Sequence, residues 1–344
     1  MDPLLLILLI ETLLLSLLLG PLLMTRRLIR RNQPLKALPW AKTTLALGRV
    51  FPFLRGIGNL NVAACYVMAD DFTTALPHAE QAVNYFALRS SPKFRANRAI
   101  GLSYLGIALS RTGQMQQAEQ RLDEALSLGI RNPSVRAHAE IIAANVYLNR
   151  GRLADAGRLM EQVLAMPKLD EERRSAAENL LAGQKYYSED FAGGLTLARQ
   201  ALQRKTTPAR FLVAATINAQ FCLTELGELR EAQALEAGIL SQISEAPRNI
   251  QSAALRASAN LALKLGNLDR AREQAERAAL LDSTPNAYAA SLLIQAEVFA
   301  LRQNFQRAAS LTDAVLRSEA IDFYQRRARA LQGRLSAPPL SALQ

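Results

Sequence analysis

The chain has 344 residues, and 50% of them are hydrophobic, which supplies enough apolar surface for a continuous core and excludes extensive disorder. Good helix formers dominate and strand-like runs of Val, Ile and Thr are scarce, so we expect an all-α fold. The formal net charge is +11, of which residues 1–69 supply +6 (eight basic and two acidic residues); without a basic stripe along the rest, we expect no nucleic-acid partner.

Residues 1–24 predict a transmembrane anchor. From Leu4 to Met24, 16 of 21 residues are Leu, Ile or Met. As a helix this stretch is about 31 Å long, enough to cross a hydrocarbon core of about 30 Å. A cleaved signal peptide is the alternative, but such a peptide has a basic start, whereas here Asp2 precedes the apolar run. Basic residues follow the run instead, which favours an uncleaved anchor: Arg26, Arg27, Arg30 and Arg31.

The same charges predict the orientation of the anchor. Between Thr12 and Ala69 there are eight basic residues and no acidic one. Because positive charge stays on the cytoplasmic side, we expect a single-pass protein with its amino terminus outside and the remainder in the cytoplasm. Residues 25–55 then form a basic juxtamembrane connector. Residues 37–54 either lie on the membrane, with Trp40 at the interface, or cap the following structure, and the sequence leaves both open.

A short pattern then returns seven times, at intervals of about 38 residues, and predicts stacked helical hairpins. Each copy has a polar residue or Gly at a turn, followed two positions later by a large apolar residue. The seven turn positions are Asp70, Gly113, Gly151, Glu189, Gly227, Gly266 and Gln303.

Two columns of small residues accompany the turns. Five positions after each turn the residue is Ala or Gly, and seven positions before it the residue is also small, except at Gln220. Small residues on facing helices let the two backbones approach closely, and large ones force them apart. We therefore expect the fifth hairpin, which contains Gln220, to be the least regular.

At these positions the chain resembles the tetratricopeptide-repeat (TPR) family. The stretch from Tyr104 to Leu126 is similar to the helix–turn–helix signature of that family. Four positions depart from its first-helix aromatic: Leu109, Lys185, Leu223 and Ala262. The family repeat is shorter, at about 34 residues. The resemblance implies a right-handed superhelical solenoid of about seven hairpins over residues 56–318, preceded by the one transmembrane helix.

After the repeats, residues 319–335 predict a cap helix, because a terminal repeat needs a polar outer face. Residues 336–344 contain a Pro-Pro step and predict a disordered tail.

Nothing in the sequence predicts catalysis, a cofactor or a metal site. His78 and His138 lie in different repeats, and Cys65 and Cys222 lie far apart in apolar stretches. An active site needs convergent nucleophiles, bases or metal ligands, so we do not expect an enzyme.

Partner binding is the remaining role, and the resemblance implies that it takes place in the concave groove lined by the first helix of each hairpin. Polar residues that reach this groove stand three, six and ten positions before each turn, with others one position further round. The candidate groove residues are Ser103, Arg111, Asn145, Asn179, Tyr186, Arg256 and Asn260. Other groove positions are largely apolar, which favours an amphipathic helix as the ligand: Leu60, Ile107, Ile141, Ile217, Phe221 and Leu293.

We therefore expect a membrane-anchored scaffold that binds partner proteins or peptides through a TPR groove. Its membrane contacts are residues 4–24 and the basic residues Arg26, Arg27, Arg30 and Arg31. Two alternatives remain: an exported repeat protein in envelope assembly, and a regulatory domain that senses a peptide or another ligand.

Overall fold

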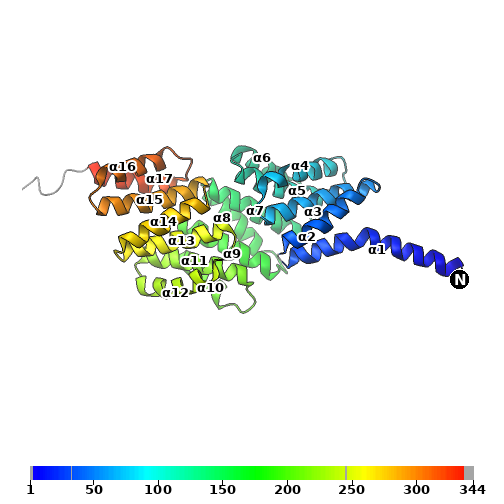
Figure 1. Ribbon diagram of the computed structural model, residues 1–344, viewed down its shortest axis with the longest axis horizontal. Helices are drawn as coiled ribbons and strands as arrows, with labels where there is room; N and C mark the ends of the chain where they lie inside the picture. Colours follow the sequence, from blue (N-terminus) through cyan, green and yellow to red (C-terminus); the bar gives the residue numbers. More distant parts are fainter. Residues whose placement is uncertain (1–2, 32, 245, 337–344) are drawn as a thin grey trace, which may run out of the picture. The chain divides into compact units, whose positions relative to one another are not determined.

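The computed structural model describes residues 3–31, 33–244 and 246–336, without the side chains of residues 3–15, 209, 210 and 242. These residues form 17 α-helices and no strand (Figure 1). The chain divides into two compact units, Met1–Val146 and Tyr147–Gln344, each of which is described by itself.

The first unit is a succession of antiparallel helices that begins with the longest one. Its helices are α1 (Pro3–Arg30), α2 (Pro34–Leu47), α3 (Pro52–Met68), α4 (Phe72–Ala87), α5 (Pro92–Arg111), α6 (Met115–Ser127) and α7 (Pro133–Asn149), of which α7 continues into the second unit. Figure 1 shows α1 extending beyond the ends of α2 and α3.

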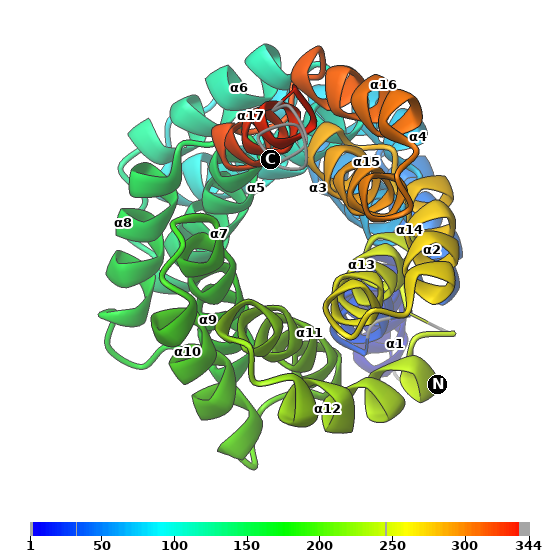
Figure 2. The same ribbon diagram turned by 90° about the vertical axis from the view of Figure 1, so that its left-hand side faces the viewer.

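The second unit continues the same alternation of helices. Its helices are α8 (Leu153–Leu164), α9 (Glu171–Tyr187), α10 (Phe191–Gln203), α11 (Ala209–Leu226), α12 (Leu229–Gln242), α13 (Arg248–Lys264), α14 (Leu268–Leu281), α15 (Pro285–Leu301), α16 (Phe305–Leu316) and α17 (Asp322–Ser336). Figure 2 shows α9, α11, α13 and α15 on the inner side, with α10, α12, α14 and α16 outside them. The first helix of each hairpin therefore lines the inner face of this unit.

The seven predicted turns are confirmed by the backbone. All seven turn residues have a positive φ, between 58° and 82°, and four of them are glycines. A left-handed residue at this place reverses the chain directly after a helix, and Gly adopts that conformation without the steric cost that a Cβ adds. The second helix then begins two residues later, in four hairpins with a side-chain cap from Asp71, Asp190, Asn267 or Asn304.

The small-residue columns produce the close helix contacts that the sequence predicts. A Cβ added to Gly106 lies 2.6 Å from Cγ of Leu122, and one added to Gly194 lies 3.2 Å from the carbonyl oxygen of Ala182, each on the facing helix of its hairpin. The Ala residues of both columns are buried. Gln220, the one large residue, is also fully buried, and both polar atoms of its amide lack a hydrogen-bond partner.

The helix α1 joins the core of the first unit at its C-terminal end. Leu22 and Thr25 are buried, and Leu28 and Ile29 pack against the cluster that contains Val62. From Leu22 onward, α1 thus belongs to the packed part of this unit. Among the residues whose placement is described, no helix is long and apolar enough to cross a membrane. The side chains of the first 15 residues, which belong to the predicted anchor, are not among those that the structure describes.

The connector predicted for residues 25–55 is largely helical. Ala37 and Ala41 of α2 are fully buried in the same cluster as Val62 and Cys65 of α3. The approach is close, because a Cβ added to Gly58 lies 2.6 Å from Cα of Leu45. The helix α2 therefore packs on the first hairpin as a cap, and Trp40 keeps 40% of its surface exposed.

At the other end, the predicted cap helix is α17, which begins at Asp322 and includes Ser336. The rest of the tail predicted to be disordered, residues 337–344, lies outside the described residues. One face of α17 is apolar and buried, with Phe323, Tyr324, Ala328 and Leu331 each at most 8% exposed. This helix is more than a solvating cap, because it also reaches the inner face of the second unit.

Candidate functional site: the inner face of the second unit

Three inner helices of the second unit present polar and aromatic side chains at their C-terminal ends. Tyr186 and Tyr187 close α9, Glu225 lies two residues before the Gly227 turn of α11, and Asn260 lies on the last two turns of α13. Successive hairpins stack side by side, so residues at similar distances from their turns lie next to each other. We call the set Tyr186, Tyr187, Glu225 and Asn260 the α17 site, because α17 covers it.

The carboxylate of Glu225 is the centre of the hydrogen bonding in the α17 site. Its Oε1 accepts hydrogen bonds from the Tyr186 hydroxyl at 3.3 Å, from Nδ2 of Asn260 at 3.2 Å and from Nη1 of Arg327 at 2.9 Å. The first two donors belong to the inner helices, and Arg327 belongs to α17. The Glu225 side chain is only 9% exposed. A buried carboxylate needs a cation and several donors, and α17 supplies the cation.

The electrostatics of Glu225 reflect this pairing. Burial raises the pKa of its carboxyl, but the hydrogen bond and charge of Arg327, with the charge of Lys264 and the hydrogen bond from Asn260, outweigh burial and leave the pKa below its ordinary value. The ionised form is therefore the one that the folded second unit favours.

An aromatic cluster lies beside the carboxylate. The Phe323 ring of α17 is 5.4 Å from the Tyr186 ring and 5.5 Å from the Tyr187 ring, measured between centroids. The Tyr324 ring lies 5.9 Å from the Tyr187 ring, and their hydroxyl oxygens are 3.5 Å apart. Burial raises the pKa of Tyr186 and of Tyr324 well above the usual range, so both hydroxyls remain protonated donors. Tilted and edge-on rings at these distances attract each other beyond the apolar area they bury.

The start of α17 is fixed to distant parts of the second unit by one asparagine. Asn286, at the start of α15, donates from Nδ2 to the Asn149 carbonyl at 2.8 Å and accepts from the Ile321 backbone N–H at 2.9 Å. An exposed ion pair, Arg326 with Glu189 at 2.8 Å, adds a weaker contact. Residues that are 137 positions apart in sequence therefore contact each other, Asn149 with Asn286 and Glu189 with Arg326.

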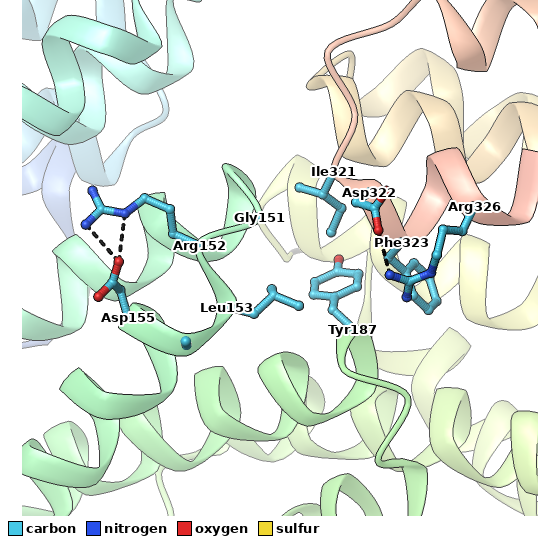
Figure 3. Close-up of a pocket in the computed structure, with 10 residues that line it drawn as sticks. Gly151, Arg152, Leu153, Asp155, Tyr187, Ile321, Asp322, Phe323 and Arg326 are labelled. Carbon is cyan, nitrogen blue, oxygen red and sulfur yellow. Dashed lines mark hydrogen bonds and ion pairs between the residues drawn. The ribbon is translucent and has the colours of Figure 1, made fainter.

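A cavity of about 350 Å³ remains between the α7–α8 turn and the start of α17 (Figure 3). Gly151, Leu153 and Tyr187 line one side, and Ile321 and Phe323 the other. Its charged groups are paired among themselves: Arg152 with Asp155 at 2.8 Å, and Arg326 with Asp322 at 2.6 Å. With its charges neutralised, this space is suited to apolar groups rather than to an ionic ligand.

The structure brings together three of the seven candidate groove residues. Tyr186 and Asn260 bind Glu225 directly. Arg256 lies one turn before Asn260 on α13, where its Nη1 donates to Oγ of Ser252 at 2.7 Å and its charge acts on the Tyr324 hydroxyl. Asn179 lies further along the inner face, where it donates to the Ser175 carbonyl within α9. It also donates to the Phe211 carbonyl and accepts from Nδ2 of Asn218, bonds that join α9 to α11.

The other three candidates belong to the first unit. Ser103 is fully buried, and its hydroxyl donates to the Ala99 carbonyl at 2.8 Å, so it offers nothing to a partner at the surface. Arg111 is half-buried with its guanidinium 5.8 Å from the Phe72 ring centre. Asn145 is half-buried on α7.

Neither Glu225 nor Asn149 is among the site residues predicted from the sequence, although their distance from a turn is a signal for them. Both stand two positions before a turn, the same place that Tyr187 and Lys264 occupy in neighbouring hairpins. Taken together, these positions place Glu225 between Tyr187 and Lys264 on adjacent inner helices. They predict a charged cluster at one edge of the second unit. The residues of α17 that meet it, Phe323 and Arg327, carry no such signal because their contacts are distant in sequence.

In the described part of the chain, no group of three or more His, Cys, Asp or Glu side chains could hold a metal ion. Burial raises the pKa of Cys65 to about 11 and, with the charges of Glu225 and Asp190, that of Cys222 to about 12, so neither thiol is a reactive thiolate at neutral pH. Nδ1 of His78 is hydrogen-bonded to Oδ1 of Asn59 at 2.9 Å.

Comparison with known proteins identifies the fold. No protein-family model and no curated protein sequence matches the chain. Among solved structures, it is similar to a Rap protein complexed with Competence and Sporulation Factor, at 16% identity and a TM-score of 0.61, over 93% of this chain and 98% of that one. Apo RapI matches at 13% identity and a TM-score of 0.55, again over 93% and 98%.

A tetratricopeptide repeat protein from Parabacteroides merdae ATCC 43184 matches over 82% of this chain and 99% of that one, at 14% identity and a TM-score of 0.52. Identities this low show the fold alone. With the seven turns and the paired small-residue columns, they show that this chain has the all-helical repeat fold of tetratricopeptide-like proteins.

Proposed function

We propose that this protein is a non-enzymatic scaffold that binds segments of partner proteins along the inner face of its hairpins. The observation that supports this most is the α17 site, where inner helices place aromatic rings, a buried carboxylate and an asparagine side by side. These groups recognise a helix or peptide in other complexes through stacking and charge-assisted hydrogen bonds.

Site-specific photo-crosslinking in cells tests this proposal. A photo-reactive residue at Asn145, Tyr186 or Arg256 is expected to capture partner proteins, because these positions lie on first helices of hairpins. Arg230, which is exposed on the outer helix α12, is the matched control. Capture from Arg230 with none from the three inner positions contradicts a groove on the inner face.

Membrane attachment is the second part of the proposal. Leu17, Leu19 and Leu23 on α1 keep 61%, 39% and 59% of their surface exposed, and Arg26 and Arg27 follow them. An apolar helix surface next to cations suits a lipid bilayer with anionic headgroups. We propose that α1 anchors the chain with its amino terminus outside and its hairpins in the cytoplasm.

Membrane fractionation separates the anchor from its alternatives. The intact chain is expected to stay in the membrane pellet after a carbonate wash, with the hairpins digested when protease is added from the cytoplasmic side. Release by carbonate contradicts the anchor. Protection of the hairpins from cytoplasmic protease, with digestion from the outside, favours the exported alternative instead.

A peptide-sensing regulator is the second candidate function. The Rap protein of similar fold is complexed with Competence and Sporulation Factor, and this chain shares that fold over most of its length. If the inner face senses a peptide, the captured species at Arg256 is a short peptide rather than a folded protein, which mass spectrometry of the crosslinked product distinguishes.

A further inference from the structure

The α17 site is occupied by a segment of the same chain. The groups of the inner face that suit a partner, Tyr186, Glu225 and Asn260, are the groups that contact α17. A partner that reaches them therefore meets α17 first. What α17 presents shows which chemistry this surface binds.

The contact surface of α17 is short and defined. Phe323 and Tyr324 supply two adjacent rings, and Arg327 follows one helical turn later on the same face. The Arg327 guanidinium lies 4.4 Å from the Phe323 ring centre and binds Glu225 at 2.9 Å. An aromatic pair fills the space beside Tyr186 and Tyr187, and the arginine neutralises the carboxylate.

Two features of this contact suit replacement of α17 by another helix. It holds an ion pair beside the aromatic rings, and an unpaired Glu225 leaves a buried carboxylate that attracts another cation. The cavity of about 350 Å³ beside Ile321 and Phe323 also shows that α17 does not fill the space next to the α7–α8 turn.

We propose that the α17 site is a docking site for an amphipathic helix that carries an aromatic pair and an arginine one turn later, and that a partner helix of this chemistry takes the place of α17. The inference rests on the proposed function, since it names the class of partner that the inner face binds. In the absence of the partner, α17 occupies the site as a tethered competitor.

A peptide of residues 318–336, labelled with a fluorophore, tests the docking site on the full chain. In the Arg327→Glu chain, a carboxylate faces Glu225, and we expect α17 to leave the site. The residues of the site itself, Tyr186, Tyr187, Glu225 and Asn260, are unchanged. The peptide is expected to bind this chain at least tenfold more tightly than the unaltered chain, where tethered α17 competes at an effective concentration in the millimolar range.

Two controls define the chemistry of the contact. Arg334→Glu changes an exposed arginine of the same helix, 67% exposed and 3.9 Å from Glu297, so α17 stays in place and the peptide binds no better than to the unaltered chain. A peptide that itself carries Arg327→Glu is expected to lose binding to the opened chain, by which we mean the Arg327→Glu chain whose α17 has left the site.

A second opened variant guards against misfolding of the first. Phe323→Ala removes the ring that contacts Tyr186 and Tyr187 and weakens α17 without a charge change. Circular dichroism establishes which opened chain remains folded, and hydrogen exchange of residues 322–336 measures the release of α17. Equal peptide affinity for opened and unaltered chains, or no binding to a folded chain whose α17 is released, overturns the proposal.

The outcomes also separate this inference from the proposed function. If the peptide binds the opened chains but inner-face crosslinking captures no partner, the docking site stands and the scaffold function fails. If a partner is captured but an excess of the peptide does not compete with it, the scaffold function stands and the shared docking site fails.

Discussion

The left-handed turn residues differ in how much steric strain each carries. Gly227 has φ of 81°, and a Cβ added there meets nothing within 4 Å, so an alanine at this position costs backbone strain alone. We expect Gly227→Ala to lower the free energy of unfolding by about 1 kcal/mol. Urea denaturation measures it. An unchanged midpoint contradicts the role of the positive φ.

The opposite change is available at Gln303, which has φ of 60°. Gln303→Gly removes the Cβ strain of about 1 kcal/mol but adds flexibility to the unfolded chain. We expect a net gain of about 0.5 kcal/mol in the free energy of unfolding. Gln233→Gly, on an exposed helix surface, is the control and is expected to lose stability, because glycine there only lowers helix propensity.

The buried amide of Gln220 is a source of instability at the fifth hairpin. Both its polar atoms are without a partner in a fully buried position. Gln220→Met keeps the volume and removes the unpaired groups, so we expect a gain of about 1–2 kcal/mol in the free energy of unfolding. Gln220→Asn keeps an unpaired amide and leaves a gap, and it is expected to lose stability. Destabilisation by methionine indicates that the amide is hydrogen-bonded after all.

The carboxylate of Glu225 makes the stability of the second unit depend on pH. Its folded pKa lies below the ordinary value, so its contribution is fully present above about pH 4.5 and is lost as the pH falls through the folded pKa. We expect Glu225→Gln to cost about 1–3 kcal/mol at pH 7 and much less at pH 3. Urea denaturation at the two pH values checks this. If the two chains differ by the same free energy of unfolding at both pH values, ionisation of Glu225 does not contribute to stability.

At the scale of elements, the position of α17 depends on Asn286. Its side chain bonds two backbone groups that belong to α7 and to the start of α17. Asn286→Ala removes both hydrogen bonds, at a cost of about 1–3 kcal/mol, and we expect amide hydrogen exchange in α17 to rise at least tenfold. Asn304→Ala, which removes only a helix cap, is the control. Equal exchange of α17 in both variants contradicts the role of Asn286.

The elements themselves were largely predictable. The turn at Gly151 and the small residues Ala144 and Ala156 are local signals, because they set the geometry of one hairpin, and the structure has a helix on each side of that turn. The extent of α1 was less predictable. The apolar pattern of α1 is continuous. It therefore does not distinguish the part from Leu22 onward, which packs on α2, from the part that extends beyond α2.

The candidate site was predictable only in part, for the same physical reason. Tyr186 and Asn260 follow from the repeat, since their distance from the turn places them on the inner face. Their partner Arg327 lies 102 residues beyond Glu225, and no periodic pattern connects the two. The seven repeats also give no sign that the chain divides into two units at Val146, within α7.

In the whole molecule, α17 is proposed to compete with a partner for the α17 site. This claim requires that holding α17 in place blocks partner binding. Gly151 and Ile321 offer a means to hold it: a Cβ added to Gly151 lies 3.5 Å from Cβ of Ile321, within the range of about 3.5–4.5 Å that disulfides adopt. The positive φ of 77° at position 151 strains a cysteine equally in the reduced and oxidised chain, so the two forms are a matched pair.

The most direct test is therefore photo-crosslinking at Arg256 in the Gly151→Cys, Ile321→Cys chain, with and without a reducing agent. We expect the reduced chain to capture its partner at the level of the chain without these cysteines, and the oxidised chain to capture at most a tenth as much. Equal capture by the oxidised and reduced chains contradicts the claim that the partner replaces α17.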